Sequence, residues 1–175
     1  WNTVYIHDGK IHHTISSNDG FSWDTDTIIS GSVSGITSTS NPTLVEDDNG
    51  TLQVVFASAG NGIYHTRKTI NGSWSTPTKI YNSSGTSYPT LITNHDTGHV
   101  VFVRYESGGG MIAGPGGYYK VYYGIFNIAS SSSLNIRKQI YSSSVSTVTA
   151  TSLTQFPNRQ LHVAWSRSNE IYHSS

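Results

Sequence analysis

A short pattern recurs four times along this chain, and it constrains the fold more than any other feature. In each copy a β-branched residue is followed by two rings: Ile11-His12-His13-Thr14, Ile63-Tyr64-His65-Thr66, Val121-Tyr122-Tyr123-Gly124 and Ile171-Tyr172-His173-Ser174. Every copy follows an alternating apolar run, which is typical of a half-buried β-strand. The recurrence therefore predicts an array of similar β units.

These β units share a strand order. Residues 41–81 serve as the reference unit, with strands expected at 41–45, 52–56, 63–66 and 74–81 and with turn residues such as Asn-Gly between them. Residues 88–141 repeat the order, with strands expected at 88–92, 99–103, 119–126 and 134–141. Four antiparallel strands in about 45 to 50 residues is the size of a β-propeller blade.

The pattern as a whole predicts an all-β protein, a β-propeller built from four-stranded antiparallel blades. We expect about 3.5 blades and about 14 strands in a single domain, with blades at approximately 1–31, 41–81, 88–141 and 150–175 of the 175 residues. The first blade then lacks its inner strand and the last lacks its outer strand. Because unpaired strand edges invite pairing, we expect self-association or further blades to cover them.

The composition excludes several classes of partner. Ten basic and ten acidic side chains cancel, so the counterion release that drives nucleic-acid binding has no obvious source. No run approaches the roughly 18 apolar residues that a membrane span needs, and cysteine is absent, which excludes a disulfide scaffold and a thiol nucleophile. Charged residues make up 11% of the chain, against about 25% in an average soluble domain. This balance suits a secreted or cell-surface protein.

One segment carries a family resemblance. Residues 16–23, Ser-Ser-Asn-Asp-Gly-Phe-Ser-Trp, resemble the Asp box (BNR repeat) of sialidase-like β-propellers, Ser-x-Asp-x-Gly-x-Thr-Trp, with Asn18 in place of Asp and Ser22 in place of Thr. Residues 70–74 resemble a worn copy of the box. In that family the box lies between the third and fourth strands, on the side opposite the ligand face.

The resemblance implies a structural role for the box residues Ser16, Asn18, Gly20 and Trp23. Their side chains and backbone mainly satisfy the hydrogen bonds of the turn and seat the Trp against the blade. We accordingly expect Trp23, and Trp74 in the worn copy, to be buried.

The resemblance also implies which end of the blades binds ligand. In such propellers the loops from second to third strands and from fourth to first strands lie on the ligand face. One of these loops is enlarged, because 18 residues separate Phe102 from Val121 where six separate Phe56 from Ile63. The excess, residues 106–117, is rich in glycine, and loops of this kind are often binding elements. The alternative is a tolerated surface insertion.

The candidate ligand-binding residues are Arg104, Tyr105, Glu106, Tyr118 and Arg167. The two arginines occupy one repeat position at the ligand-face end of the second strand, where guanidinium groups could grip a carboxylate, as they do in sialidases. The tyrosines could supply a stacking face for a sugar ring. In the competing interpretation each Arg pairs with its neighbouring Glu, Glu106 or Glu170.

These observations favour a carbohydrate-binding or adhesive module without catalysis, whose partner is a glycan, with acidic sugars among the candidates. The alternative is an exo-sialidase or related glycoside hydrolase whose remaining blades lie outside this chain, and a third is a structural repeat of a surface assembly. A working sialidase would also show an Arg-Ile-Pro segment, a third Arg, an Asp acid/base and a Tyr–Glu nucleophile pair. The Arg-Ile-Pro segment is absent, no motif locates the others, and we assign no catalytic residue.

No cofactor and no metal site are predicted. His13, His65 and His173 repeat at one strand position and so lie in separate blades. Their spacing is therefore better explained by the structural repeat than by shared binding of a metal ion. Asn49, Asn71 and Asn82 begin sequons for glycosylation, but Asn-Gly is also turn chemistry, and we interpret these triplets mainly as turns.

Overall fold

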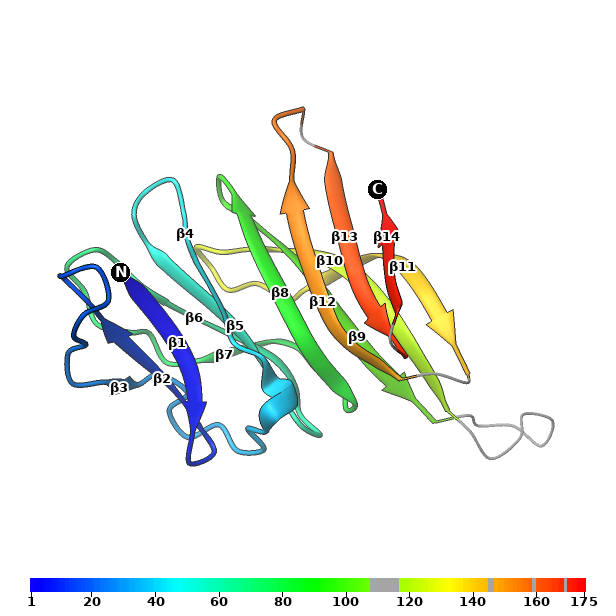
Figure 1. Cartoon of the computed structure of the whole chain (residues 1–175), viewed down its shortest axis with the longest axis horizontal. Coiled ribbons are helices and arrows are strands. Elements are labelled where there is room, and N and C mark those ends of the chain that lie inside the picture. Colours follow the sequence, from blue (N-terminus) through cyan, green and yellow to red (C-terminus); the bar gives the residue numbers. More distant parts are fainter. Residues whose placement is uncertain (108–116, 145–146, 159, 169) are drawn as a thin grey trace.

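The computed structural model describes residues 1–107, 117–144, 147–158, 160–168 and 170–175. Within these ranges the chain forms 14 β-strands and one short 3₁₀ helix, η1 (Ser38–Ser40). The strands make four antiparallel sheets that follow one another in sequence order (Figure 1). The prediction of an all-β propeller portion with this number of strands is therefore confirmed. No helix in the described ranges is long and apolar enough to span a membrane.

Each sheet is a simple meander, because neighbouring strands are consecutive in the chain. The first sheet contains β1 (Asn2–His7), β2 (Lys10–Ile15) and β3 (Thr27–Ile28). The second contains β4 (Thr43–Glu46), β5 (Leu52–Ser58), β6 (Gly62–Lys68) and β7 (Thr78–Tyr81). The third contains β8 (Thr86–Asn94), β9 (Thr97–Glu106), β10 (Tyr118–Asn127) and β11 (Asn135–Ser143). The fourth contains β12 (Val148–Gln155), β13 (Leu161–Arg167) and β14 (Glu170–Ser174).

The strands of the second and third sheets agree with the sequence pattern within a few residues, except at one strand. The sequence pattern predicts a strand over 74–81, whereas β7 begins only at Thr78. Trp74 instead forms an isolated bridge with Lys68. Pro77 immediately precedes β7, and its missing N–H explains why the ladder does not continue toward Trp74.

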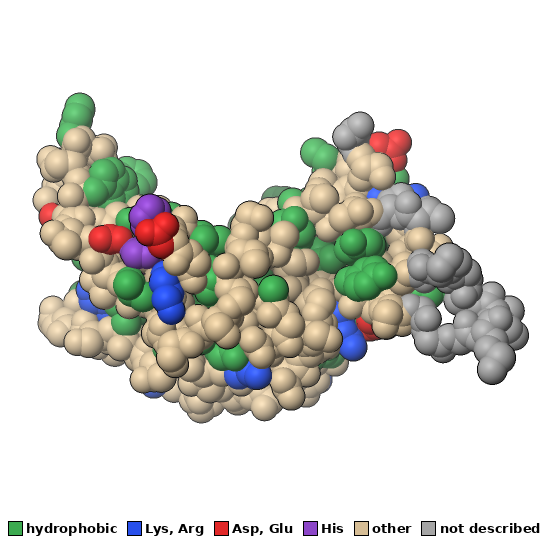
Figure 2. Space-filling view, turned by 90° about the horizontal axis from the view of Figure 1, so that it is seen from below, with side chains coloured by type: hydrophobic (Ala, Val, Ile, Leu, Met, Phe, Trp, Pro, Cys, Tyr) green, Lys and Arg blue, Asp and Glu red, His purple; other side chains and the backbone are tan. Residues whose placement is uncertain are grey.

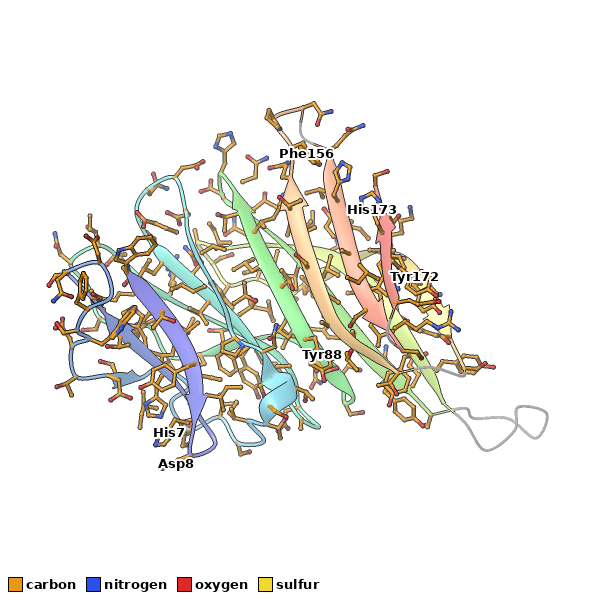
Figure 3. All side chains as sticks on the ribbon, in the orientation of Figure 1. His7, Asp8, Tyr88, Phe156, Tyr172 and His173 are labelled. Atoms are coloured by element: carbon orange, nitrogen blue, oxygen red, sulfur yellow. The ribbon has the colours of Figure 1, made fainter. Side chains whose placement is uncertain are left out.

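Each sheet carries a stacked ring pair, which in the second, third and fourth sheets faces the sheet before it, and side chains fill the seams between sheets (Figure 3). The pairs are Tyr5–His12, Phe56–Tyr64, Phe102–Tyr122 and Trp165–Tyr172, with ring centroids 5.4, 5.7, 5.7 and 5.9 Å apart. Phe56 and Phe102 are fully buried, whereas Tyr5 in the first sheet is 38% exposed. Tyr5 therefore marks a sheet face that no described part of the chain covers.

Threonine side chains link the first strands of successive sheets. Thr43 Oγ1 of β4 donates to Pro89 O of β8 at 2.8 Å, and Thr90 Oγ1 of β8 donates to Thr151 O of β12 at 2.9 Å. The space-filling view shows the outline of the molecule hollowed between its first and fourth sheets (Figure 2). The sheets thus fan out as the blades of an open propeller do.

The expectation that Trp23 and Trp74 are both buried is wrong. Trp74 is half-buried, and its ring meets the His13 ring of the preceding sheet with centroids 5.0 Å apart. Trp23 holds the equivalent position in the first sheet and is 46% exposed. The position packs against the preceding sheet, and within the described residues nothing precedes the first sheet.

Candidate functional site

The expected ligand-face end of the third sheet gathers charged and aromatic side chains. In the ladder between β9 and β10, Arg104 lies opposite Lys120, and Glu106 lies opposite Tyr118. Opposed residues of an antiparallel pair share a face, and so do residues two apart on one strand. These four side chains therefore belong to one face of the sheet, the face that also carries Tyr122.

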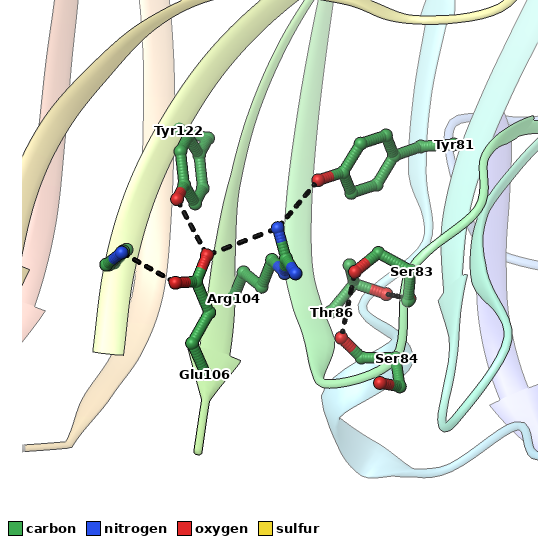
Figure 4. Close-up of polar contacts among 8 residues, drawn as sticks. Tyr81, Ser83, Ser84, Thr86, Arg104, Glu106 and Tyr122 are labelled. Atoms are coloured by element: carbon green, nitrogen blue, oxygen red, sulfur yellow. Dashed lines mark hydrogen bonds and ion pairs between the residues drawn. The ribbon is translucent and has the colours of Figure 1, made fainter. Parts of the chain in front are cut away.

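A single carboxylate organises this cluster (Figure 4). Glu106 Oε2 accepts from Lys120 Nζ at 2.6 Å, and Glu106 Oε1 accepts from Tyr122 OH at 2.8 Å. Arg104 Nη1 lies 3.2 Å from the same Oε1 and donates to Tyr81 OH of the second sheet, also at 3.2 Å. The site thus spans the seam between the second and third sheets.

The electrostatics of the cluster follow from these contacts. The hydrogen bond from Lys120, followed by the hydrogen bond from Tyr122 and the charge of Arg104, lowers the pKa of Glu106. Burial and then the hydrogen bond to Glu106 raise the pKa of Tyr122, and the bond to Glu106 raises the pKa of Lys120. At neutral pH the cluster therefore holds two cations and one anion, which leaves one net positive charge.

A pocket of about 400 Å³ opens beside the cluster, lined by Ser84, Gly85, Arg104, Tyr105, Glu106 and Ser107. The loop before β8 comes close to the end of β9 here, since Tyr105 N donates to Gly85 O at 2.9 Å. A Cβ atom at Gly85 would lie 2.5 Å from Tyr105 O, and Gly85 has a φ of +74°. Only glycine fits this approach without strain, so it shapes the wall of the pocket.

The structure brings four of the five candidate ligand-binding residues to one sheet edge. Arg104, Glu106 and Tyr118 share a face, and Tyr118 is 37% exposed. Tyr105 is 41% exposed and points to the opposite face, where its ring meets Tyr119 with centroids 5.0 Å apart. The ion pair between Arg104 and Glu106 is the neighbour pairing that the competing interpretation expected.

The fifth candidate lies elsewhere. The Arg167 guanidinium sits over the rings of Tyr141 and Tyr172, 5.9 and 5.7 Å from their centroids, in the seam between the third and fourth sheets. Glu170 accepts a short hydrogen bond from Tyr172 OH. Arg167 therefore does not line the pocket beside Arg104, although both arginines hold the same repeat position.

The box residues form a compact turn. Ser16 Oγ accepts from Gly20 N at 2.8 Å and donates to Asn18 Oδ1 at 3.0 Å. Asn18 Oδ1 also accepts from Ser22 N at 2.9 Å. These bonds satisfy the turn locally, as a structural role requires, while Trp23 projects into solvent.

Sequence reasoning missed Lys120, Tyr122 and Tyr81 as members of the cluster. Tyr122 carried a signal, because it belongs to the recurrent ring pattern. Lys120 and Tyr81 carried none, because the first depends on the register across the enlarged hairpin and the second on packing between sheets. Residues 108–116 of the expected glycine-rich binding loop lie outside the described residues. Within the described ranges no group of three or more His, Asp or Glu side chains could hold a metal ion.

Neither the known family models nor the curated proteins contain a match to this chain. Among solved structures, an α-L-arabinofuranosidase, Arb93A from Fusarium graminearum in complex with an iminosugar inhibitor, superposes with a TM-score of 0.63 at 16% identity, covering 98% of this chain and 54% of that one. An endo-arabinase from Bacteroides thetaiotaomicron gives 0.53 at 12% identity, covering 98% and 72%. The K499G mutant of NanB sialidase from Streptococcus pneumoniae gives 0.52 at 14% identity, covering 93% and 25%.

This chain spans about half the length of the arabinofuranosidase and a quarter of the sialidase. At sequence identities this low, the superpositions show a shared fold and say nothing about a shared activity. The four successive meander sheets, the ring pairs in their seams and these superpositions together show that the chain has a β-propeller fold.

Proposed function

We propose that this chain is a carbohydrate-binding module that acts without catalysis, and that its glycan binds in the pocket beside Arg104. The observation that carries the proposal is the make-up of this pocket. Two serine hydroxyls, a guanidinium, a carboxylate and an exposed tyrosine line about 400 Å³. Sugar sites combine polar groups for the hydroxyls with an aromatic face for the apolar side of the ring.

The charge of the pocket suits an acidic sugar. The cluster of Arg104, Lys120 and Glu106 keeps one net positive charge at neutral pH, since one carboxylate faces two cations. A sugar carboxylate could take a charge-assisted hydrogen bond from the guanidinium while Tyr118, which shares the face of Arg104, stacks on the ring. The three solved structures above are an arabinofuranosidase, an endo-arabinase and a sialidase, and their common work on sugars supports a glycan ligand.

The protonation states of Glu106 and Tyr122 support a function without catalysis. Lys120, Arg104 and Tyr122 hold Glu106 in its ionised form, so it is a poor proton donor at neutral pH. Burial raises the pKa of Tyr122 and so keeps its hydroxyl protonated. Glu106 is therefore stabilised as a carboxylate and Tyr122 as a neutral hydroxyl, which are the states that form a hydrogen bond between them.

One observation favours a second candidate, a glycoside hydrolase. Tyr122 OH lies 2.8 Å from Glu106 Oε1, and a hydroxyl beside a carboxylate base is the arrangement of an activated nucleophile. It is also the Tyr–Glu pairing that no sequence motif located. Release of a fluorophore from a fluorogenic sialoside or arabinofuranoside by the wild-type chain would establish this candidate in place of the first.

A third candidate, a structural role, is favoured by the repetition of the arginine contacts. Arg104 contacts Tyr81 of the preceding sheet, and Arg167 contacts Tyr141 of the preceding sheet, each at the same repeat position. If the role is structural, the two arginines serve only to hold neighbouring sheets together, and the chain acts as a repeat unit of a surface assembly. The low charged fraction of 11% supports a secreted or cell-surface location for any of the three.

The repeated arginines also supply the test. Arg104→Ala should abolish binding on a glycan array, whereas Arg167→Ala, which removes the equivalent contact outside the pocket, should leave binding intact. The double variant should behave as Arg104→Ala does, and circular dichroism should show that all three keep the fold. Unchanged binding by Arg104→Ala would remove the site, and equal loss in both single variants would favour the structural role.

A further inference from the structure

The four sheets repeat one cross-strand hydrogen bond. In each sheet it links two adjacent strands. One partner lies three residues before Tyr5, Phe56, Phe102 or Trp165, and the other is the second ring of the recurrent pattern. The four contacts are Asn2 Oδ1 to His13 Nε2 at 2.9 Å, Gln53 Oε1 to His65 Nε2 at 2.7 Å, His99 Nδ1 to Tyr123 OH at 2.8 Å and His162 Nδ1 to His173 Nε2 at 2.7 Å. Among these four described contacts, only that of the fourth sheet joins two imidazoles.

The chemistry of this fourth contact differs from the others. A neutral imidazole has one donor and one acceptor nitrogen, so the hydrogen bond between His162 and His173 depends on a single shared proton. When the donor ring changes tautomer, this proton moves to the other nitrogen of the same ring, and both facing nitrogens then carry lone pairs. His65 has both nitrogens occupied, by Gln53 and Ser131, and so offers no such pair. Imidazole nitrogen is a preferred ligand of copper, nickel and zinc.

The two nitrogens are close enough for one ion to bind both after the rings turn. They are 2.7 Å apart along a hydrogen bond, so their lone pairs point at each other. Two ligands about 2.0–2.1 Å from a metal are about 2.9 Å apart at a right angle and about 3.4 Å apart at the tetrahedral angle, so a turn of both rings and a small increase in separation would direct the two lone pairs at one ion. Among divalent ions that imidazole binds, the general order of affinity places Cu²⁺ above Ni²⁺ and Zn²⁺.

The two rings are also held close together before any ion binds. The rings of His162 and His173 are within 22° of parallel, with centroids 4.9 Å apart. Phe156 packs edge-on against His162, with centroids 4.4 Å apart and planes at 82°. Figure 3 shows Phe156 and His173 together at the same end of the fourth sheet. Both strands belong to one antiparallel ladder, so metal binding has to turn the two rings but does not have to order the backbone.

We propose that His162 and His173 form a two-nitrogen binding site for a divalent transition metal, with Cu²⁺ preferred over Zn²⁺. The ion takes the place of the shared proton, which moves to the other nitrogen of the donor ring, and the ion so joins β13 to β14. Water completes its coordination because the contact lies at an exposed edge. The proposal is independent of the glycan pocket, which lies in the third sheet. It also departs from the sequence expectation, in which the histidines at this repeat position only follow the strand register.

The test uses the untagged chain, freed of metal with a chelator and titrated with CuSO₄ at neutral pH. Calorimetry should give one equivalent of bound Cu²⁺, and its electron paramagnetic resonance spectrum should show two equatorial nitrogens. His162→Gln is the informative variant, because it recreates the Gln53–His65 contact of the second sheet and so should keep the fold. Loss of an outer-shell partner already costs about 10- to 100-fold in affinity, so loss of this ligand should cost at least about tenfold.

His95→Gln is the matched control, since His95 is exposed and contacts Asp48 instead of a second imidazole. It should bind Cu²⁺ as the wild type does. Wild-type affinity in His162→Gln, a single coordinated nitrogen in the wild type, or a loss in His95→Gln equal to that in His162→Gln would each overturn the proposal. Weaker binding of Zn²⁺ than of Cu²⁺ is expected, and the reverse order would overturn the assigned metal preference.

Discussion

His65 donates a hydrogen bond through Nε2 to Gln53 Oε1 over 2.7 Å, and both side chains are buried. The remaining ring nitrogen, Nδ1, accepts from Ser131 Oγ of the third sheet at 2.8 Å. Gln53 Nε2 in turn donates to Asp47 Oδ2 at 2.8 Å. The four side chains form a continuous polar chain that joins the second sheet to the third, and burial of His65 lowers its pKa and keeps the imidazole neutral at neutral pH.

This relationship makes stability depend on pH. Burial lowers the pKa of His65 to about 4, against about 6.5 in an unfolded chain. Between these values the unfolded state binds a proton that the folded state does not, so stability is fully present above about pH 6.5 and falls as the pH drops toward 4. The loss due to His65 should approach about 1.4 kcal/mol per pH unit, measured by urea unfolding at several pH values.

His65→Gln is the control for this prediction, because it removes the titrating group while retaining a polar side chain. Burial also lowers the pKa of His13 and of His99, so some dependence on pH should remain. The slope between pH 6.5 and 4 should nevertheless be shallower than in the wild type. An identical slope would show that His65 is not the group responsible.

Glu106 should also lose its stabilising effect as the pH falls, but in a lower pH range than His65. Its contacts lower its pKa in the folded state, so its stabilising effect is present above the unfolded value of about 4.3 and is lost as the pH falls through the folded value. Glu106→Gln should therefore lower the midpoint of thermal unfolding at neutral pH and have little effect at about pH 2 to 3. Glu170→Gln is the matched control, since Glu170 contacts Tyr172 at an exposed edge, and it should have the smaller effect at neutral pH.

The two tryptophans should differ in their contribution to stability. Trp74 is half-buried against His13, so Trp74→Ala should cost about 2 kcal/mol, below the 3–5 kcal/mol of a fully buried Trp. Trp23 is 46% exposed, so Trp23→Ala should change the free energy of unfolding by no more than about 0.5 kcal/mol. Urea unfolding measures both, and a larger loss in Trp23→Ala would show that this side chain is covered in solution.

The uncovered face of the first sheet should drive association. Tyr5, Trp23 and Ile28 are 38%, 46% and 53% exposed, and Tyr5 and Trp23 correspond to positions that later sheets bury in their seams. We expect light scattering to show species larger than the 19.0 kDa monomer, because large exposed apolar faces are rare in monomers. A double substitution of Tyr5 and Trp23 by Ser should shift the population toward the monomer. A monodisperse, thermally stable wild-type monomer would contradict this prediction.

The strands and the box turn could be predicted from the sequence because their causes are local. Short apolar runs bounded by turn residues identify β5 and β9 whatever surrounds them, and the structure buries both faces of these strands over most of their length. The bonds from Ser16 and Asn18 close within the turn itself, so the sequence pattern alone determines them. The recurrence of the ring pattern likewise predicted an array of similar β units.

The membership of the candidate site was decided only by the tertiary structure. Lys120 reaches Glu106 because the ladder places it opposite Arg104, and no local rule predicts that register across a long insertion. Tyr81 meets Arg104, and Tyr141 meets Arg167, because successive sheets pack face to face. Local sequence thus determined strands and turns, whereas contacts between distant residues depended on register and on packing between sheets, which brought Arg104 to the pocket and left Trp23 exposed.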